Sequence, residues 1–165
     1  MKYIKQYSKL TEIAKSIPQS ADNWELFDAV RRLSVVRIKQ LLGEGCNTNI
    51  QNKIGRTPLM NAVVVEGTTQ AKIIRIIELL ENKGADLNIK DFMNEDTALI
   101  KAAKLQRGRV VETLIELGAE WYHKNKEGKD FLDFFNEQFR EDMKYQYPEQ
   151  YQEYLLKRDA SKYNL

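Results

Sequence analysis

The sequence predicts an all-α fold, a solenoid of about four stacked helix-turn-helix units with protruding β-turn tips and a helical cap at both ends. Similar segments recur with equivalent positions at Trp24, Thr57, Thr97 and Asp130, so the spacings are 33, 40 and 33 residues. Each unit contains two helical stretches with apolar residues three or four positions apart, and a glycine closes the second stretch. We therefore expect a single domain over residues 1–165, in which each unit buries its apolar face against its neighbours.

The chain begins with a predicted capping segment over residues 1–22. An amphipathic helix in this segment is expected to stop at Pro18, because proline cannot continue a helix interior. Such a helix would cover the first repeat, which has no preceding unit to pack against. The apolar residues that form its periodic face are Ile4, Tyr7, Leu10, Ile13, Ala14 and Ile17.

Three repeats are predicted over residues 23–54, 55–93 and 94–127. In the second and third repeats, the first helix has small and apolar residues on one face, and the second helix has a larger apolar face. Neither helix can bury that surface alone, so the two must pack together and against the next unit. The residues of these faces are Leu59, Ala62, Val63, Ile73, Ile74, Ile77 and Leu80, and then Leu99, Ala102, Ala103, Val110, Val111, Leu114 and Ile115.

The ends of the second helices have recognisable signals. Ser34 and Thr69 stand where a second helix should begin, and their hydroxyls can accept hydrogen bonds from its first backbone N–H groups. Gly45, Gly84 and Gly118 stand just after each second helix, where glycine adopts the left-handed conformation at little cost. An unrelated helical bundle with coincidental glycines is the alternative interpretation.

A C-terminal capping repeat and helix are predicted over residues 128–165. Pro148 suits the first turn of a helix, because the N–H that proline lacks has no helical partner there. Tyr151, Tyr154 and Leu155 then fall on one side of this helix. We expect that side to close the end of the stack.

Two linked motifs resemble those of a known family. Residues 55–62 read GRTPLMNA and, after a helical stretch, residues 84–88 read GADLN. The pattern returns as DTALIKAA over residues 96–103 and VVETLIELGA over residues 110–119. In both halves this resembles the ankyrin repeat, and the resemblance covers about residues 24–135. It implies the stacked fold described above and a non-catalytic role in binding other proteins.

The sequence departs from the ankyrin pattern in three places. Met60 and Ile100 replace the usual histidine of the first helix, so apolar packing must replace a hydrogen bond between repeats. The usual tip glycine becomes Asn94 in the third repeat, and asparagine tolerates the left-handed conformation better than most residues. Residues 66–70 are expected to form an enlarged loop between the two helices of the second repeat, projecting away from the tips.

Composition and charge exclude several classes of protein. Apolar residues make up 42% of the chain, and no apolar run approaches the roughly 18 residues that a membrane-spanning helix needs. The 26 basic and 24 acidic residues give a net charge of +2, too small an excess for a dedicated nucleic-acid binder, and acidic residues surround the basic stretch at Arg31 and Arg32. Because Cys46 is the only cysteine and the first residues lack a signal-peptide pattern, we expect a cytoplasmic protein.

No catalytic residue, metal site or cofactor is expected. Cys46 and His123 are a conceivable nucleophile and base, but Cys46 occupies the place of Ala85 and Ala119 in the other copies, a small packed position. One histidine and one cysteine do not form a ligand cluster, and the spread-out glycines do not form a phosphate loop. The acidic residues within 91–96 are interpreted as loop caps, because a solenoid has no enclosed cleft for acid and base chemistry.

The ankyrin resemblance implies that partner proteins bind the turn tips and the exposed side of the first helices. Phe92 and Met93 stand out, because apolar residues at a tip are candidate anchors for a partner, while inward packing against a neighbouring tip is the alternative. Trp121 takes the place of Leu87 and is interpreted as core, with a partner contact as its alternative. The expected partner-binding residues are Lys53, Ile54, Arg56, Phe92, Met93, Glu95, Lys101, Lys104, Lys126 and Lys129.

We therefore expect a non-catalytic protein–protein interaction module, monomeric when free, that captures another protein on its concave face. An inhibitor or immunity-type role is the sharpest form of this hypothesis. A secreted host-directed effector is the alternative. An enzyme is the remote alternative, and a deep pocket with convergent polar groups would favour it.

Overall fold

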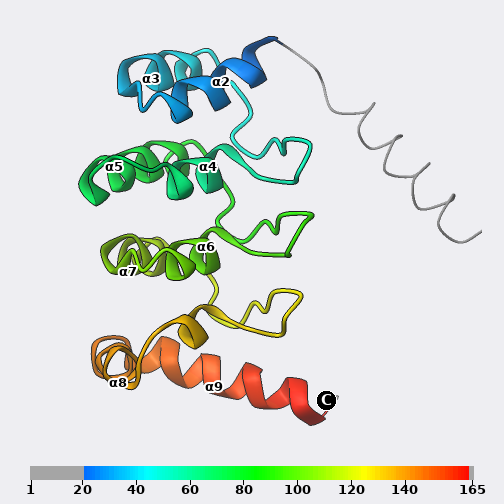
Figure 1. Ribbon diagram of the computed structural model, residues 1–165, viewed down its shortest axis with the longest axis vertical. Helices are drawn as coiled ribbons and strands as arrows, with labels where there is room; N and C mark the ends of the chain where they lie inside the picture. Colours follow the sequence, from blue (N-terminus) through cyan, green and yellow to red (C-terminus); the bar gives the residue numbers. More distant parts are fainter. Residues whose placement is uncertain (1–20, 164–165) are drawn as a thin grey trace, which may run out of the picture.

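The computed structural model describes residues 21–163, so the helical cap expected at the N-terminus lies outside the described residues up to residue 20. Within the described range the chain forms eight α-helices and one 3-10 helix, with no strand. Helix pairs stack in layers along the long axis of the molecule (Figure 1). The predicted all-α solenoid is confirmed.

The first three layers are helix pairs of similar length. They are α2 (Ala21–Arg31) with α3 (Val35–Gly43), α4 (Pro58–Val64) with α5 (Gln70–Glu81), and α6 (Ala98–Lys104) with α7 (Gly108–Glu116). The first helices α2, α4 and α6 contact one another in sequence, and the second helices α3, α5 and α7 form a parallel row. Their apolar faces meet in one continuous core that runs through all the layers. Met60 and Ile100 are each 1% exposed, so apolar packing does occupy the usual histidine position.

The first helices begin with a threonine cap. Thr57 Oγ1 accepts a hydrogen bond from the Met60 N–H at 3.2 Å, and Thr97 Oγ1 accepts one from the Ile100 N–H at 3.3 Å. Both threonines are buried, so the cap also satisfies donors that water cannot reach. This explains why the same residue type recurs at the start of the motif.

The second helices share a glycine after their C-terminal ends but differ in how their N-terminal ends are capped. Gly45, Gly84 and Gly118 have φ angles of 86°, 81° and 92°, so the left-handed conformation expected at these helix ends is present. Thr69 accepts a hydrogen bond from the Lys72 N–H at 3.4 Å and caps α5 as predicted. Ser34 takes the cap position of α3 without a side-chain cap hydrogen bond, so the expected hydroxyl cap is wrong there.

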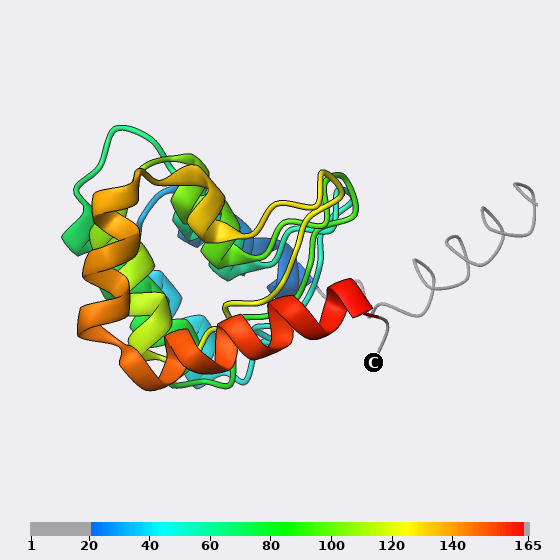
Figure 2. The same cartoon turned by 90° about the horizontal axis from the view of Figure 1, so that it is seen from below.

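Three further helices close the C-terminal end. The 3-10 helix η1 (Phe131–Phe134) stands where the next first helix would be, followed by α8 (Glu137–Gln146) and α9 (Pro148–Tyr163). Pro148 begins α9 as predicted, and α9 runs across the end of the stack (Figure 2). Trp121 is 5% exposed and forms edge contacts with the rings of Phe131, Tyr147 and Tyr151. The interpretation of Trp121 as core is confirmed.

A buried hydrogen bond joins α9 to the last repeat. The Tyr154 hydroxyl donates to Asp130 Oδ2 at 2.9 Å, and Asp130 Oδ1 accepts the Leu132 N–H at 2.9 Å. Burial, aided by the nearby Asp130 carboxylate, raises the pKa of Tyr154 to about 12, so the phenol remains a donor over the physiological range. This contact fixes the terminal helix against the start of η1.

The segments that join successive helices project to two opposite sides of the molecule. Those joining α3 to α4, α5 to α6 and α7 to η1 extend to one side and turn back at aligned tips (Figure 1). The loop that joins α4 to α5, over residues 65–69, is longer than the loops inside the other two helix pairs and lies on the side opposite the tips (Figure 2). Arg107 holds the base of this loop, because its guanidinium donates to the carbonyl oxygens of Val63 and Val65 at 2.7 Å each.

Candidate protein-binding surface

The three tips share one hydrogen-bonding plan. Asn52 Oδ1 accepts the backbone N–H groups of Ile54 and Arg56 at 3.1 and 3.0 Å, which closes the second-repeat tip. Asn125 Oδ1 repeats this arrangement in the fourth repeat. Asp91 takes the same place in the third repeat, where its Oδ1 accepts the Asn94 N–H at 2.8 Å. Asparagine and aspartate suit this position because their short side chains reach the backbone two or three residues on.

Each tip also needs one residue in the left-handed conformation. Gly55 and Gly128 provide it in two tips, with φ angles of 80° and 74°. In the third tip Glu95 has a φ of 57°, whereas Asn94 is not among the residues with a positive φ. The expectation for Asn94 is therefore wrong. The extra residue in this tip moves the left-handed position one place along the chain, and an aligned neighbouring tip constrains Glu95 to accept it.

Neighbouring tips are hydrogen bonded to each other. The Phe92 N–H donates to the Ile54 carbonyl oxygen at 3.1 Å, and the Lys126 N–H donates to the Asn94 carbonyl oxygen at 2.9 Å. The Lys126 ammonium adds hydrogen bonds to the carbonyl oxygens of Phe92 and Met93 at 2.9 and 2.7 Å. The tips therefore form one connected surface, with Lys126 holding the third tip in place.

Three apolar side chains are exposed on this connected surface. Ile54, Phe92 and Met93 are 37%, 51% and 59% exposed. Phe92 also lies over Gly55, where a Cβ would overlap the backbone nitrogen and ring of Phe92. Phe92 therefore packs in part against the neighbouring tip and is otherwise exposed to solvent, and its role as an anchor for a partner stays a prediction.

The same surface carries more positive than negative charge. Lys53, Arg56 and Lys126 lie beside the three apolar residues, and Glu95 is the exposed acidic residue of the third tip. Lys129 pairs with Glu127 at 3.1 Å. We define the tip patch as Lys53, Ile54, Arg56, Phe92, Met93 and Lys126.

Lys101 does not lie on the exposed surface. Its side chain is 5% exposed and its ammonium forms an ion pair with Asp91, with Asp96 Oδ2 3.6 Å away. The expectation that Lys101 lies on the exposed side of the first helix is therefore wrong. The Asp91 carboxylate closes the third tip and the Asp96 carboxylate lies beside it, so buried cations are needed to balance the two charges.

Lys104 and Asn125 complete this buried network. Lys104 is 27% exposed and its ammonium lies 2.8 Å from Asp96 Oδ1, while the Asn125 amide donates to the same oxygen at 3.1 Å. Burial by itself would raise the pKa of Asp91, but hydrogen bonds from the Lys101 ammonium and the Asn94 N–H outweigh it and lower that pKa. The network joins α6 to its own tip and to the next one.

On the exposed side of the first helices, next to the tips, the aromatic ring of Phe134 lies near two lysine ammonium groups. The ammonium groups of Lys104 and Lys129 lie 5.5 and 5.8 Å from the centroid of the Phe134 ring. Leu105, at the end of α6, is 40% exposed. This region is continuous with the tips through Lys129, so it extends the candidate surface toward the helices.

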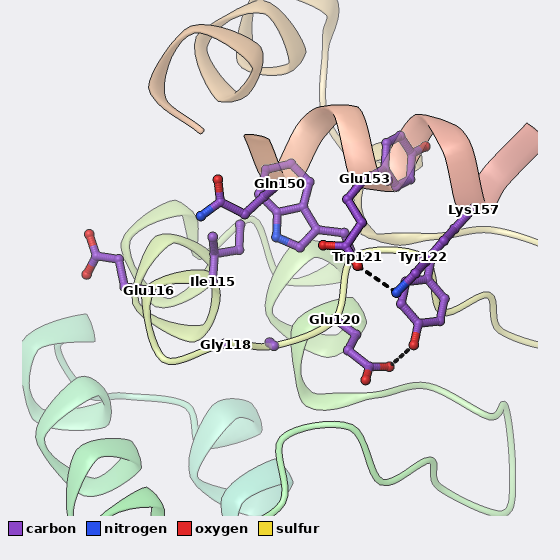
Figure 3. Close-up of a pocket in the computed structure, with 11 residues that line it drawn as sticks. Ile115, Glu116, Gly118, Glu120, Trp121, Tyr122, Gln150, Glu153 and Lys157 are labelled. Carbon is purple, nitrogen blue, oxygen red and sulfur yellow. Dashed lines mark hydrogen bonds and ion pairs between the residues drawn. The ribbon is translucent and has the colours of Figure 1, made fainter. Parts of the chain in front are cut away.

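A pocket lies between the end of α7 and α9 (Figure 3). Tyr122 donates a hydrogen bond to Glu120, and the Lys157 ammonium pairs with Glu153 at 2.7 Å while lying 4.1 Å from the centroid of the Tyr122 ring. The hydrogen bond to Glu120 raises the pKa of Tyr122, and the Glu153 carboxylate raises that of Lys157. Both groups therefore keep their protons at neutral pH, so neither acts as a base there.

The residues considered for catalysis lie apart. Cys46 follows α3 and His123 follows α7, so the layers α4–α5 and α6–α7 separate them (Figure 1). Burial lowers the pKa of His123, although the nearby Glu120 opposes this effect. Among the described residues, no group of three or more His, Cys, Asp or Glu side chains is placed to hold a metal ion.

The basic stretch of the first repeat is locally neutralised. Arg31 and Arg32 both lie 2.6 Å from oxygens of Asp28, and Arg37 pairs with Glu25. A phosphate backbone would have to compete with these carboxylates. Over the part of the chain that the structure describes, no helix is both long and apolar enough to cross a membrane.

Sequence reasoning missed the asparagines that join successive repeats. Asn49 Nδ2 donates to the Gly84 carbonyl oxygen at 2.9 Å, while its Oδ1 accepts the Asp86 N–H at 2.7 Å. Asn88 Oδ1 accepts the Glu120 N–H at 2.9 Å in the next repeat. The signal was present, because asparagine stands at the same place in both copies, four residues after the glycine that follows the second helix.

Comparisons with known proteins agree with this architecture. The chain is 33% identical over 104 residues to the human SH3 and multiple ankyrin repeat domains protein 2, covering 61% of this chain and 5% of that protein. It is 39% identical over 77 residues to a putative ankyrin repeat protein of fowlpox virus, covering 47% of this chain and 21% of that protein. It is 29% identical over 125 residues to the rat ankyrin repeat and SAM domain-containing protein 6, covering 75% of this chain and 13% of that protein.

These relatives are much longer than the region they share with this chain, which spans about a fifth of their length or less. The family model for ankyrin repeats, in three copies, matches residues 26–125. That match covers more than half of the chain and runs from within α2 to beyond the end of α7. The chain therefore belongs to the ankyrin-repeat family, whose repeats are protein–protein interaction modules.

Proposed function

We propose that this chain captures a partner protein on its concave face, with the tip patch as the main contact. The observation that carries the proposal is the group of exposed apolar residues at Ile54, Phe92 and Met93, held on tips that are hydrogen bonded to each other. Exposed apolar side chains on a rigid surface are suited to anchoring a partner, because little conformational entropy is lost on binding. Lys104, Lys129 and Leu105 extend the contact along the first helices.

The proposed role is non-catalytic binding in the cytoplasm. The pairing of the polar pocket residues with one another and the separation of Cys46 from His123 support a binding role over an enzymatic one. Capture of this kind blocks the surface of the partner that it covers, as an inhibitor or immunity-type protein does. If the captured partner has an activity of its own, adding the chain in excess should reduce it.

The test is a pull-down from a lysate of the source cells, with bound proteins identified by mass spectrometry. The wild-type chain is compared with the double variant Arg56→Glu, Phe92→Ala. We expect a protein that the wild type retains and the double variant loses, while the midpoint of thermal unfolding barely changes, since substitutions on the surface rarely cost more than about 0.5 kcal/mol.

The same set of proteins in both lanes would contradict binding through the tip patch. A large fall in the thermal midpoint of the double variant would show instead that Phe92 contributes mainly to stability. Leu156→Ala is the matched control, because Leu156 is 73% exposed on α9 and does not belong to any of the tips. This control should retain every protein that the wild type retains.

A further inference from the structure

Arg56 has an unsatisfied hydrogen-bond donor at the base of the second tip. Its side chain is partly buried, and its Nε is shielded from solvent without a hydrogen-bond acceptor among the described residues. Because the Nε is shielded, a ligand reaches only the two terminal nitrogens of the guanidinium, which are not among the buried unpaired atoms. A carboxylate fits them best, because it accepts two parallel hydrogen bonds from one guanidinium.

The charges around Arg56 favour an anionic ligand. Lys53 belongs to the same tip and makes no ion pair with the described carboxylates, and the Lys126 ammonium bonds only to uncharged carbonyl oxygens. The buried carboxylates of Asp91 and Asp96 are already balanced by lysines of α6. Glu95 is the exposed carboxylate of the third tip, and the three cations Lys53, Arg56 and Lys126 outnumber it. The tip surface therefore keeps a net positive charge, which attracts acidic segments.

The apolar part of the tip patch adjoins these cations. Phe92 bonds through its N–H to the Ile54 carbonyl oxygen and lies over Gly55, the residue next to Arg56. An apolar side chain that packs on Phe92 and Met93 therefore lies beside the guanidinium of Arg56. A ligand that carries an apolar side chain next to a carboxylate would therefore contact the apolar residues and the guanidinium together.

From these contacts we infer that the tip patch binds an acidic peptide segment of the partner protein, with a large apolar side chain on Phe92 and Met93 and a carboxylate on Arg56. The inference rests on the proposed function, in which the same patch captures a partner. To that function the inference adds which side chains the bound segment of the partner carries. A peptide suffices as a ligand, because the patch spans only adjacent tips.

The experiment uses the full chain, immobilised, to select from a phage-displayed library of random peptides. Selected sequences are synthesised with a fluorescent label, and their affinity is measured by fluorescence anisotropy at low and high salt. We expect enriched peptides to place Asp or Glu next to Leu, Ile, Met, Phe or Trp. Their binding should weaken as salt is added, since screening reduces the attraction between opposite charges.

Two substitutions separate the apolar and the ionic contact. Phe92→Ala should reduce affinity roughly tenfold or more, as loss of a central anchor does. Arg56→Lys keeps the charge but removes the paired donors, so affinity should fall several-fold even though the net charge is unchanged. Met93→Ala provides a second apolar test in case loss of the Phe92 ring disturbs the tip at Gly55.

Two matched variants serve as controls. Lys72→Glu reverses a charge on the exposed side of α5, and Leu156→Ala removes an exposed apolar side chain from α9. Neither should change peptide affinity by more than about twofold, because neither residue belongs to the tips. Circular dichroism and the thermal midpoint confirm that each variant is folded.

Three outcomes would overturn the inference: enriched peptides that are neutral or basic, no peptide enriched above the bare support, or affinity that is unaffected by Phe92→Ala, Met93→Ala and Arg56→Lys. The lysate experiment distinguishes this failure from failure of the proposed function. If the double variant still loses a cellular partner while no acidic peptide is selected, capture by the tips stands and only the acidic chemistry is wrong.

Discussion

At the scale of single residues, charge inside the third repeat determines how the tips are held. Asp91 and Asp96 are 3% and 2% exposed, and the ammonium groups of Lys101 and Lys104 reach them from α6. Two buried carboxylates are tolerated only because cations and hydrogen-bond donors surround them. The tip that carries Phe92 and Met93 therefore depends on Lys101, a lysine that is itself buried.

Replacing Lys101 with methionine should destabilise the protein by about 3 kcal/mol, because it leaves Asp91 buried without its cation. Urea unfolding measured by circular dichroism gives the change. Lys104→Met is the matched control and should cost less, because that side chain is 27% exposed and Asp96 keeps its hydrogen bond from Asn125. A loss below about 1 kcal/mol for Lys101→Met would show that water already reaches this ion pair.

Two buried aspartates should give opposite dependences of stability on pH. The pKa of Asp91 is lowered in the folded state, so its contribution is present above the unfolded pKa and is lost as pH falls through the folded value. Burial raises the pKa of Asp130, and the Asp133 charge adds to this despite the hydrogen bond from Tyr154. The contribution of Asp130 is therefore greatest below the unfolded pKa and falls as pH rises through the raised value.

The variants Asp91→Asn and Asp130→Asn test these signs by urea unfolding between about pH 3 and pH 7, around the usual aspartate pKa. The stability difference between wild type and Asp91→Asn should grow in favour of the wild type as pH rises. The difference for Asp130→Asn should move the other way over the same range. Parallel curves for both variants would contradict the assignment of opposite shifts.

At the scale of helices, a hydroxyl residue before a helix caps it only where the backbone of that residue is extended. Thr69 caps α5 through its hydroxyl, and Thr57 and Thr97 do the same for α4 and α6. Ser34 has a ψ of 84°, outside the extended conformation of the three threonine caps, and makes no such bond to α3. Leu33, just before it, has a positive φ of 55°, so the short turn from α2 positions the backbone differently.

Thr69→Ala should therefore cost about 1 kcal/mol of stability, because the first turn of α5 loses its side-chain acceptor. Ser34→Ala should cost less than about 0.5 kcal/mol, because no cap hydrogen bond is lost there. Thermal unfolding of the two variants side by side measures both. Equal losses would mean that the Ser34 hydroxyl does cap α3 in solution.

At the scale of the whole molecule, stacking separates two kinds of surface. The tips are aligned on one side, and the loop over residues 65–69 projects on the opposite side (Figure 2). Arg107 bonds the base of that loop to α7, which fixes its direction. A partner bound at the tips therefore does not reach the loop unless it surrounds the solenoid.

Removing residues 66–68 should leave partner capture unchanged in the lysate experiment, because the loop and the tip patch lie on opposite sides. The double variant at Arg56 and Phe92, which we expect to abolish capture, provides the comparison. The thermal midpoint of the shortened chain should be measured first, since the deletion approaches the cap at Thr69. Loss of capture by a folded, shortened chain would place part of the contact on the loop.

The sequence by itself determined the repeat architecture of this protein, because the signals involved are local. Threonine at a helix start and glycine after a helix act within a few residues, and the spacing of apolar positions specifies which face is buried. These signals also located the tips, the enlarged loop and the start of α9 at Pro148. The same local logic identified Trp121 as core, since it replaces Leu87 in a repeated position.

Only the tertiary structure decided which charged and polar side chains face solvent. Lys101 has the sequence context of an exposed helical residue, yet it is buried because two carboxylates of the preceding tip lie against α6. Glu95 takes the left-handed position because hydrogen bonds between aligned tips constrain the lengthened turn. Both outcomes depend on contacts between segments that are distant in sequence or in different repeats, and local patterns do not encode such contacts.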